Sequence, residues 1–132
     1  MDVTIVSPEQ RVWHGEADMV IARSPEGEFG IMRGHIPFLA ALVPGRVTVV
    51  AGSEREEFFV PGGFLEASGS MDDYHVIVLA DDADRTSDID ADEARRRLEE
   101  ARRRRDEDAD ERAEAALRVE MARVEIAEGR GH

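Results

Sequence analysis

The stretch YHVIVLADDADRTSDIDADEARRRLEEA, residues 74–101, decides the fold because the sequence pattern changes within it. It opens on the last of a series of short apolar runs and closes on the charged, alanine-rich pattern of a helix. All five prolines and nine of the eleven glycines lie before residue 70, and neither type recurs until Gly129. Gly and Pro punctuate short strands, whereas long helices need stretches without them. The chain therefore predicts a β domain over residues 1–83 and a helical unit over residues 84–132.

The glycine-punctuated part has the pattern of many short strands. Turn pairs such as Pro44-Gly45 and Asp72-Asp73 separate apolar or β-branched runs, with no helical period between them. The runs lie at residues 3–6, 11–13, 17–22, 29–32, 38–43, 47–51, 58–60, 64–67 and 74–80. We expect about eight to ten strands in an antiparallel β-sandwich or flattened barrel. Because the last run is apolar at nearly every position, we expect a central strand covered on both faces.

The glycine-free part predicts two helices that form an antiparallel hairpin. Candidate caps of the first helix are Ser87, Asp88 and Asp90, and the second begins at Asp108 or Asp110 and ends at Glu128. One narrow apolar stripe marks the first helix: Ala91, Ala94, Leu98 and Ala101. The second helix carries two stripes on nearly opposite sides, Ala115, Val119, Ala122 and Ile126 on one and Ala113, Leu117, Met121 and Val124 on the other. We expect it to pack between the first helix and either the β domain or another protein.

Charges in this part support helix formation locally. Six acidic residues each precede an arginine by four positions: Asp92 and Arg96, Glu93 and Arg97, Glu99 and Arg103, Glu100 and Arg104, Asp108 and Arg112, and Glu114 and Arg118. Together they contribute about 2 kcal/mol independently of packing. The three alanines and one leucine of the first stripe offer only about 4 kcal/mol of burial. We therefore predict a weakly docked arm. Because residues 104–110 contain no Gly or Pro, our hypothesis is that it alternates between a hairpin and an extended rod.

Composition excludes several classes of protein. The net charge is −13, with five arginines against 14 acids up to Ala83 (−9) and 12 against 16 after it (−4), so both halves would repel nucleic acid. The chain has no cysteine, which excludes disulfides and thiolate chemistry. The sequence shows neither a membrane span nor a signal peptide, and we expect membrane contact only through a partner. No nucleophile motif or metal-ligand spacing surrounds the histidines, so we expect neither a catalytic site nor a metal site.

Seven of the eleven residues from Arg95 to Arg105 are arginine. They can form a solvated face paired with the acids of the same helix. Alternatively, a surplus of positive charge can bind an acidic protein surface, and nucleic acid is a third and weaker possibility because of the flanking acids. The residues that carry this surplus are Arg102, Arg103, Arg104 and Arg105.

Four segments, in this order and ahead of a helical tail, resemble the epsilon-subunit family of bacterial F-type ATP synthases. They are SPEGEFGIMRGHIP at 24–37, LVPGRV at 42–47, PGGFLE at 61–66 and VLAD at 78–81. The resemblance spans the whole chain. It implies a non-catalytic rotor subunit whose β-sandwich binds the gamma shaft and the ring of c subunits, and which couples proton flow to ATP synthesis. It also implies helices that either fold onto the sandwich or extend along the shaft to hinder ATP hydrolysis.

The resemblance also implies partner-binding residues and a location. By motif position, Glu28 and His35 should lie in the loop that faces the c-ring and gamma. Arg33 belongs to the same segment but stands where many relatives carry Pro, which loosens the loop. The surplus arginines are candidates for meeting acidic segments of the catalytic alpha and beta subunits. We expect a peripheral protein at the cytoplasmic face of the cell membrane.

One family property is degenerate in this chain. Some members bind ATP through an Ile/Leu-Asp-x-x-Arg-Ala motif at the start of the first helix. Here the segment is IDADEA at residues 89–94, which keeps Asp90 but has Glu93 in place of the arginine. Arg123 matches a second arginine of that site, while Val119 replaces its expected partner. We therefore expect weak or absent ATP binding and no other cofactor.

Two alternative functions remain at this point. A free-standing β-sandwich binding module with a helical dimerisation tail would use the heptad-like spacing of the first helix, although three alanines make a poor seam. An enzyme would need an acid, base or nucleophile cluster, and the sequence contains none.

Overall fold

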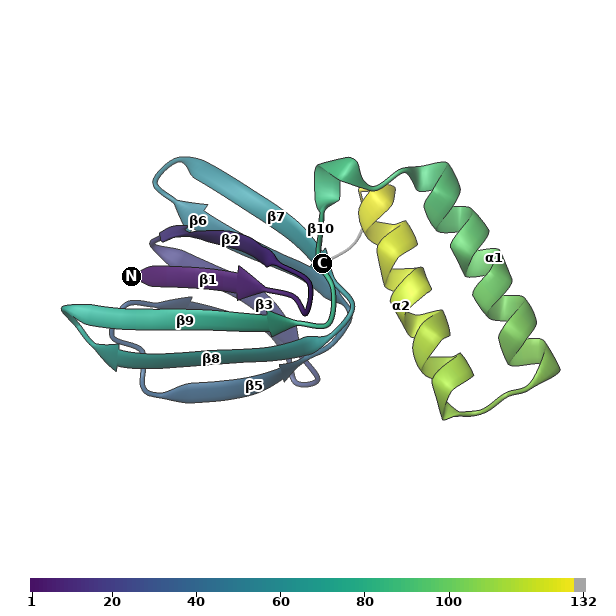
Figure 1. Cartoon of the computed structure of the whole chain (residues 1–132), viewed down its shortest axis with the longest axis horizontal. Coiled ribbons are helices and arrows are strands. Elements are labelled where there is room, and N and C mark those ends of the chain that lie inside the picture. The colour runs from purple at the N-terminus through teal and green to yellow at the C-terminus, as the bar shows by residue number, and fades with distance from the viewer. Residues whose placement is uncertain (130–132) are drawn as a thin grey trace.

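The computed structural model describes residues 1–129, which form a β-sandwich followed by a helical hairpin (Figure 1). The strands are β1 Asp2–Val6, β2 Arg11–Glu16, β3 Met19–Ser24, β4 Gly27–Met32, β5 Phe38–Leu42, β6 Gly45–Ala51, β7 Glu54–Val60, β8 Gly63–Ser70, β9 Asp73–Ala80 and β10 Asp84–Arg85. The helices are the 3-10 turn η1 Thr86–Asp88, α1 Ala91–Glu107 and α2 Glu111–Ala127. The predicted fold class is confirmed.

The strands form two five-stranded sheets that face each other. One sheet has the order β2-β1-β9-β8-β5, and the other has the order β10-β7-β6-β3-β4. All neighbouring pairs are antiparallel except β1 and β9, which run parallel with Asp2 opposite His75 and Val6 opposite Leu79. The predicted antiparallel sandwich thus contains one parallel pair, because β1 lies between its hairpin partner β2 and the late strand β9.

The strand β9 is central, as its sequence predicts, but only one of its faces is covered. Tyr74, Val76 and Val78 are almost fully buried in the core between the sheets. Ile77 and Leu79 point the other way and are 37% and 52% exposed. The expectation of burial on both faces is wrong because the second sheet covers only the inner face, and α2 contacts β6 of the opposite sheet.

Two polar residues extend the sandwich beyond Ala83. Asp84 and Arg85 form β10, which pairs with Phe59 and Phe58 of β7. A two-residue strand without apolar residues has no recognisable period, and the sequence analysis therefore did not predict it. The consequence is that the connection to the hairpin starts from an ordered sheet edge.

Polar caps position both helices as predicted. Asp90 caps α1 by accepting hydrogen bonds from the backbone N–H groups of Asp92 and Glu93, at 2.8 and 3.3 Å. Asp110 caps α2 by accepting from the N–H of Ala113 at 2.8 Å. The three-residue link between the helices, residues 108–110, contains no glycine and no positive φ angle.

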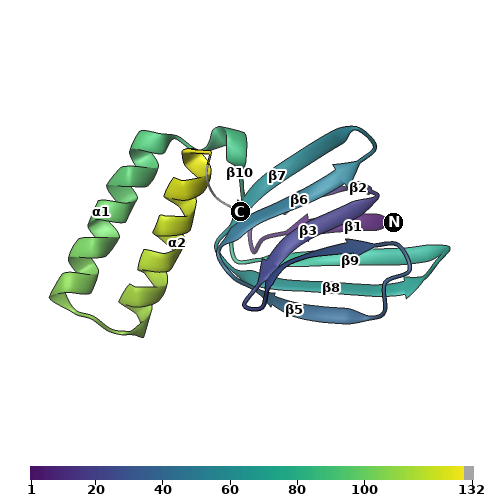
Figure 2. The ribbon, with the colours of Figure 1, turned by 180° about the vertical axis from the view of Figure 1, so that it is seen from behind.

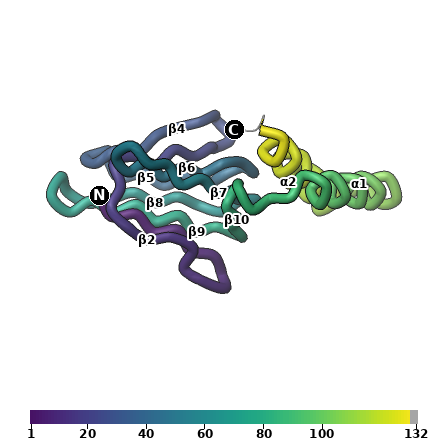
Figure 3. The backbone as a smooth tube through the Cα atoms, turned by 90° about the horizontal axis from the view of Figure 1, so that it is seen from above, coloured from purple at the N-terminus to yellow at the C-terminus, as the bar shows by residue number. Residues whose placement is uncertain are grey.

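The second helix lies between the first helix and the sandwich (Figures 1 and 2). Seen from above, the hairpin continues the long axis of the sandwich at one end (Figure 3). Leu117, Val124 and Ile126 are buried, which confirms that α2 has two covered sides. Met121 was expected on the same stripe as Leu117 and Val124 but is 43% exposed, and that part of the prediction is wrong.

Ion pairs along α1 partly follow the predicted spacing. Glu93 pairs with Arg97 at 3.4 Å and Glu100 with Arg104 at 2.9 Å, both four positions apart. Other acids pair three positions apart, as Asp92 does with Arg95. Four of the six predicted pairs do not form among residues 1–129: Asp92–Arg96, Glu99–Arg103, Asp108–Arg112 and Glu114–Arg118. The hydrogen bond from Arg96 is the main cause that lowers the pKa of the Glu93 carboxyl.

Candidate docking surfaces

Four large apolar side chains are exposed on the outer face of the sheet that contains β9. Their exposed fractions are 66% for Leu39, 52% for Phe64, 37% for Ile77 and 52% for Leu79. The strand register places Leu39, Glu66 and Ile77 in one row across the sheet, and puts Phe64 and Leu79 opposite each other in the next row. We call these four apolar residues the outer patch. Single exposed apolar residues are ordinary, but a contiguous group across three strands indicates an interaction surface.

A second exposed apolar group lies at the end of the sandwich that is far from the hairpin. It comprises the loop of residues 33–37 between β4 and β5 and the turn between β8 and β9. Met32, Ile36 and Met71 are 58%, 73% and 62% exposed, and Met32 directly precedes Arg33. We call residues 32–37 together with Met71 the end loop. Its apolar side chains are too exposed to contribute to the core, which makes it a second candidate docking surface.

Buried contacts hold the backbone of the end loop in place. The Tyr74 hydroxyl donates a 2.7 Å hydrogen bond to the His35 carbonyl oxygen, and the His35 N–H donates to the Met32 carbonyl oxygen at 3.1 Å. The His35 ring packs edge-on against Phe38 with centroids 5.4 Å apart. Burial of Tyr74 raises the pKa of its hydroxyl. A tyrosine 39 residues away thus holds the backbone of this loop, a contact that sequence reasoning missed.

The structure does not bring Glu28 and His35 into one loop. Glu28 lies near the start of β4, opposite Arg23 of β3, whereas His35 follows the end of β4. The expectation that both residues share the loop is wrong because the Gly27–Met32 segment is a strand and separates them.

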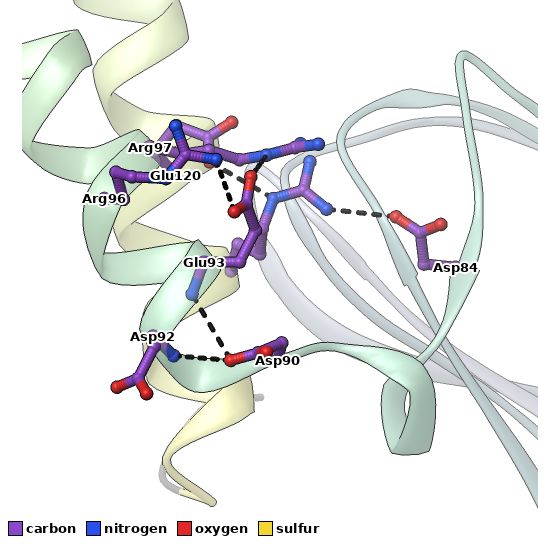
Figure 4. Close-up of polar contacts among 8 residues, drawn as sticks. Asp84, Asp90, Asp92, Glu93, Arg96, Arg97 and Glu120 are labelled. Atoms are coloured by element: carbon purple, nitrogen blue, oxygen red, sulfur yellow. Dashed lines mark hydrogen bonds and ion pairs between the residues drawn. The ribbon is translucent and has the colours of Figure 1, made fainter.

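A buried arginine joins the hairpin to the sandwich. Arg123 of α2 is 8% exposed. Its Nη1 donates to Asp84 of β10 at 3.0 Å, and its Nε donates to Glu120 at 3.1 Å (Figure 4). The guanidinium carbon lies 4.6 Å from the centre of the Phe59 ring of β7. Sequence reasoning noted Arg123 only as part of a degenerate ATP-binding motif and missed this structural role.

A small pocket of about 180 Å³ lies beside Arg123 at the start of α1. It is lined by Asp84, Asp88, Ile89, Asp90, Glu93, Ala94, Arg97 and Arg123. The structure thus brings Asp90 and Arg123 of the degenerate ATP motif to one site, as the resemblance implies. Four acids face two arginines there, and both arginines are already paired with acids of this chain. The residues present therefore do not fit a polyphosphate.

Most of the surplus arginines are paired within α1. Arg102 lies 3.4 Å from Glu99, Arg104 lies 2.9 Å from Glu100, and Arg105 lies 3.2 Å from Asp106. Arg103 is exposed and forms no ion pair within residues 1–129. The solvated-face interpretation therefore describes three of the four, and Arg103 presents an uncompensated charge.

Other kinds of site have no counterpart in the part of the chain that the structure describes. No group of three or more acidic or histidine side chains there is arranged to hold a metal ion. Across residues 1–129, neither helix has the length and apolar character needed to cross a membrane.

The chain resembles known proteins over nearly its full length. The family model for the β-sandwich domain of the ATP synthase delta/epsilon chain matches residues 1–86. The ATP synthase epsilon chain of Hydrogenovibrio crunogenus is 44% identical over 131 residues, which cover 97% of this chain and 83% of the relative. That of Myxococcus xanthus is 40% identical over 129 residues, covering 94% and 92%.

Solved structures show the same fold. A chain of the Euglena gracilis mitochondrial ATP synthase, solved with OSCP, F1 and the c-ring, superposes with a TM-score of 0.76 at 24% identity, covering 90% of this chain and 76% of that one. A chain of the Tetrahymena thermophila mitochondrial ATP synthase central stalk and c-ring gives a TM-score of 0.56 at 20% identity, covering 69% and 70%. At these identities the likeness establishes the fold alone.

Proposed function

This chain belongs to the ATP synthase epsilon chain family, and we propose that it works as a rotor subunit of the central stalk that couples proton flow to ATP synthesis. It is a non-catalytic subunit of that enzyme. The observation that carries the proposal is the pair of separate exposed apolar surfaces on one rigid sandwich, because a subunit that transmits rotation must grip two partners at once.

We assign the two surfaces to two partners. The outer patch covers a broad sheet face and suits a large rigid body, the gamma shaft. The end loop projects from one end of the sandwich and suits the loops of the c-ring, with Arg33 and His35 as polar contacts. Glu28 lies outside this loop, and we assign it to a separate contact with gamma. Binding to the ring would place the chain at the cytoplasmic face of the membrane, attached only through the complex.

The hairpin serves as a brake on ATP hydrolysis in this proposal. Its weakly docked helices can leave the sandwich and extend along the shaft toward the catalytic alpha and beta subunits. The arginine-rich face of α1 would meet acidic surfaces there, where complementary charge favours association. Arg103 contributes most to this association, because it has no ion pair within residues 1–129 to break. Arg102, Arg104 and Arg105 must each leave an acid of α1 before they can bind an acidic surface.

Removal of the hairpin tests this function. A chain that ends after Thr86 keeps all ten strands and the whole matched domain. We expect reconstituted ATP synthase with this chain to hydrolyse ATP several-fold faster than enzyme with the full chain, because the brake is gone. The shortened chain should still co-purify with gamma. Unchanged hydrolysis would contradict the brake, and loss of co-purification would contradict the assignment of docking to the sandwich.

We propose that ATP binds weakly or not at all to this chain. The support is the acidic pocket around Asp90, in which Glu93 would repel a phosphate and Arg123 already has two carboxylate partners. Titration of the full chain with Mg-ATP in a calorimeter is expected to give no saturable heat in the micromolar range. The variant Glu93→Arg restores the motif and serves as the comparison. Sub-micromolar affinity of the unmodified chain would contradict the proposal.

A further inference from the structure

The contact between the hairpin and the sandwich includes one buried charged side chain, that of Arg123. On α2 the buried side chains are Leu117, Arg123, Val124 and Ile126, so only three of them are apolar. The ion pair between Arg123 and Asp84 links α2 directly to β10. Among the ion pairs of residues 1–129, this one connects a helix of the hairpin with a strand of the sandwich. Such a contact has a preferred geometry that apolar packing alone lacks.

Arg123 contacts two kinds of partner: residues of the sandwich, which stay behind when the hairpin leaves, and a residue of α2, which moves with it. Asp84 and Phe59 belong to the sandwich, so both contacts break when α2 departs. Glu120 lies one turn earlier on α2 and moves with Arg123. The guanidinium therefore keeps a carboxylate partner in both states, and release leaves no unpaired buried charge on the helix.

We propose that Arg123 is an intramolecular latch, closed on Asp84 and Phe59, which sets the docking equilibrium of the hairpin without a bound nucleotide. The inference rests on the proposed function, because it assigns a control element to the hairpin movement. It concerns the free chain, however, and can be tested without the enzyme.

Distances between spin labels in the full chain test the latch. The chain has no cysteine, so Ser53→Cys in the β6–β7 turn and Arg118→Cys on α2 provide two unique and exposed label sites. We expect Arg123→Met to raise the ratio of undocked to docked chains about tenfold, since half-exposed Asp84 limits the strength of the pair. Arg112→Met, at an exposed arginine of α2 without an ion pair among residues 1–129, is the matched control and should change nothing.

The remaining variants distinguish the latch from a general loss of stability. Asp84→Asn should open the hairpin as well, and the double variant of Asp84→Asn with Arg123→Met should be no more open than Arg123→Met alone, because the two residues act as one contact. If Arg123→Met does not fold, Asp84→Asn alone decides the matter. A distance distribution identical to the unmodified chain in both variants would overturn the latch. If the variants open but inhibition of hydrolysis in the enzyme is unchanged, the latch stands and the proposed brake fails.

Discussion

Replacing Gly63 with alanine is expected to lower the free energy of unfolding by about 4 kcal/mol, which is at the upper end of the losses that single substitutions cause. Gly63 begins β8 with a φ angle of +137°, which side chains rarely tolerate. A Cβ there would also overlap the carbonyl oxygen of Leu79 and lie 3.0 Å from the Ala80 Cα. Both obstacles are backbone atoms of β9, so relief requires the central β8–β9 pairing to open.

A matched glycine separates the two causes of this loss. Gly27 has a φ angle of +124°, but a Cβ there would meet nothing within 4 Å. Gly27→Ala therefore carries the backbone strain without the overlap, and we expect a loss of about 1–2 kcal/mol. Denaturant unfolding of both variants measures the difference. Equal losses would show that strand pairing at Gly63 is looser than the structure indicates.

Truncating the outer patch is expected to weaken binding to the gamma shaft by about 30-fold for either Phe64→Ala or Leu79→Ala, which corresponds to about 2 kcal/mol. The two side chains face each other across β8 and β9 and are each 52% exposed. Removing them from a buried interface removes apolar area at its centre. Binding of the full-length variants to a gamma-containing complex can be measured by surface plasmon resonance.

Met121 provides the control for these two variants. It is 43% exposed on α2, away from the outer patch, and Met121→Ala makes the same kind of change. We expect it to bind gamma as the unmodified chain does. If all three variants lose affinity equally, the effect reports general destabilisation and the assignment of the patch to gamma is wrong.

The strands and helices were largely predictable because their signals are local. All nine apolar runs correspond to strands, and Asp90 and Asp110 cap the helices as expected. The misinterpretation of β9 has a physical cause. A continuous apolar run is typical of a strand buried on both faces, yet it arises equally when the outer face must bind a partner. Ile77 and Leu79 were therefore interpreted as core residues, because both a protein core and a protein interface are built from apolar side chains.

The contacts that position the candidate sites were not predictable, since they join residues distant in sequence. Tyr74 reaches His35, and Arg123 reaches Asp84, each across 39 positions. No periodicity connects such pairs. The sequence shows that Arg123 lies within the apolar pattern of α2. It does not show that Phe59 and Asp84 contact this arginine.

We propose that the hairpin docks on the sandwich by a contact weak enough to release in the working enzyme. Distances between labels at Ser53→Cys and Arg118→Cys, measured in reconstituted ATP synthase with and without nucleotide, test it most directly. We predict a short distance in the free chain and an additional long distance in the enzyme when hydrolysis is inhibited. A single short distance under every nucleotide condition would contradict the claim.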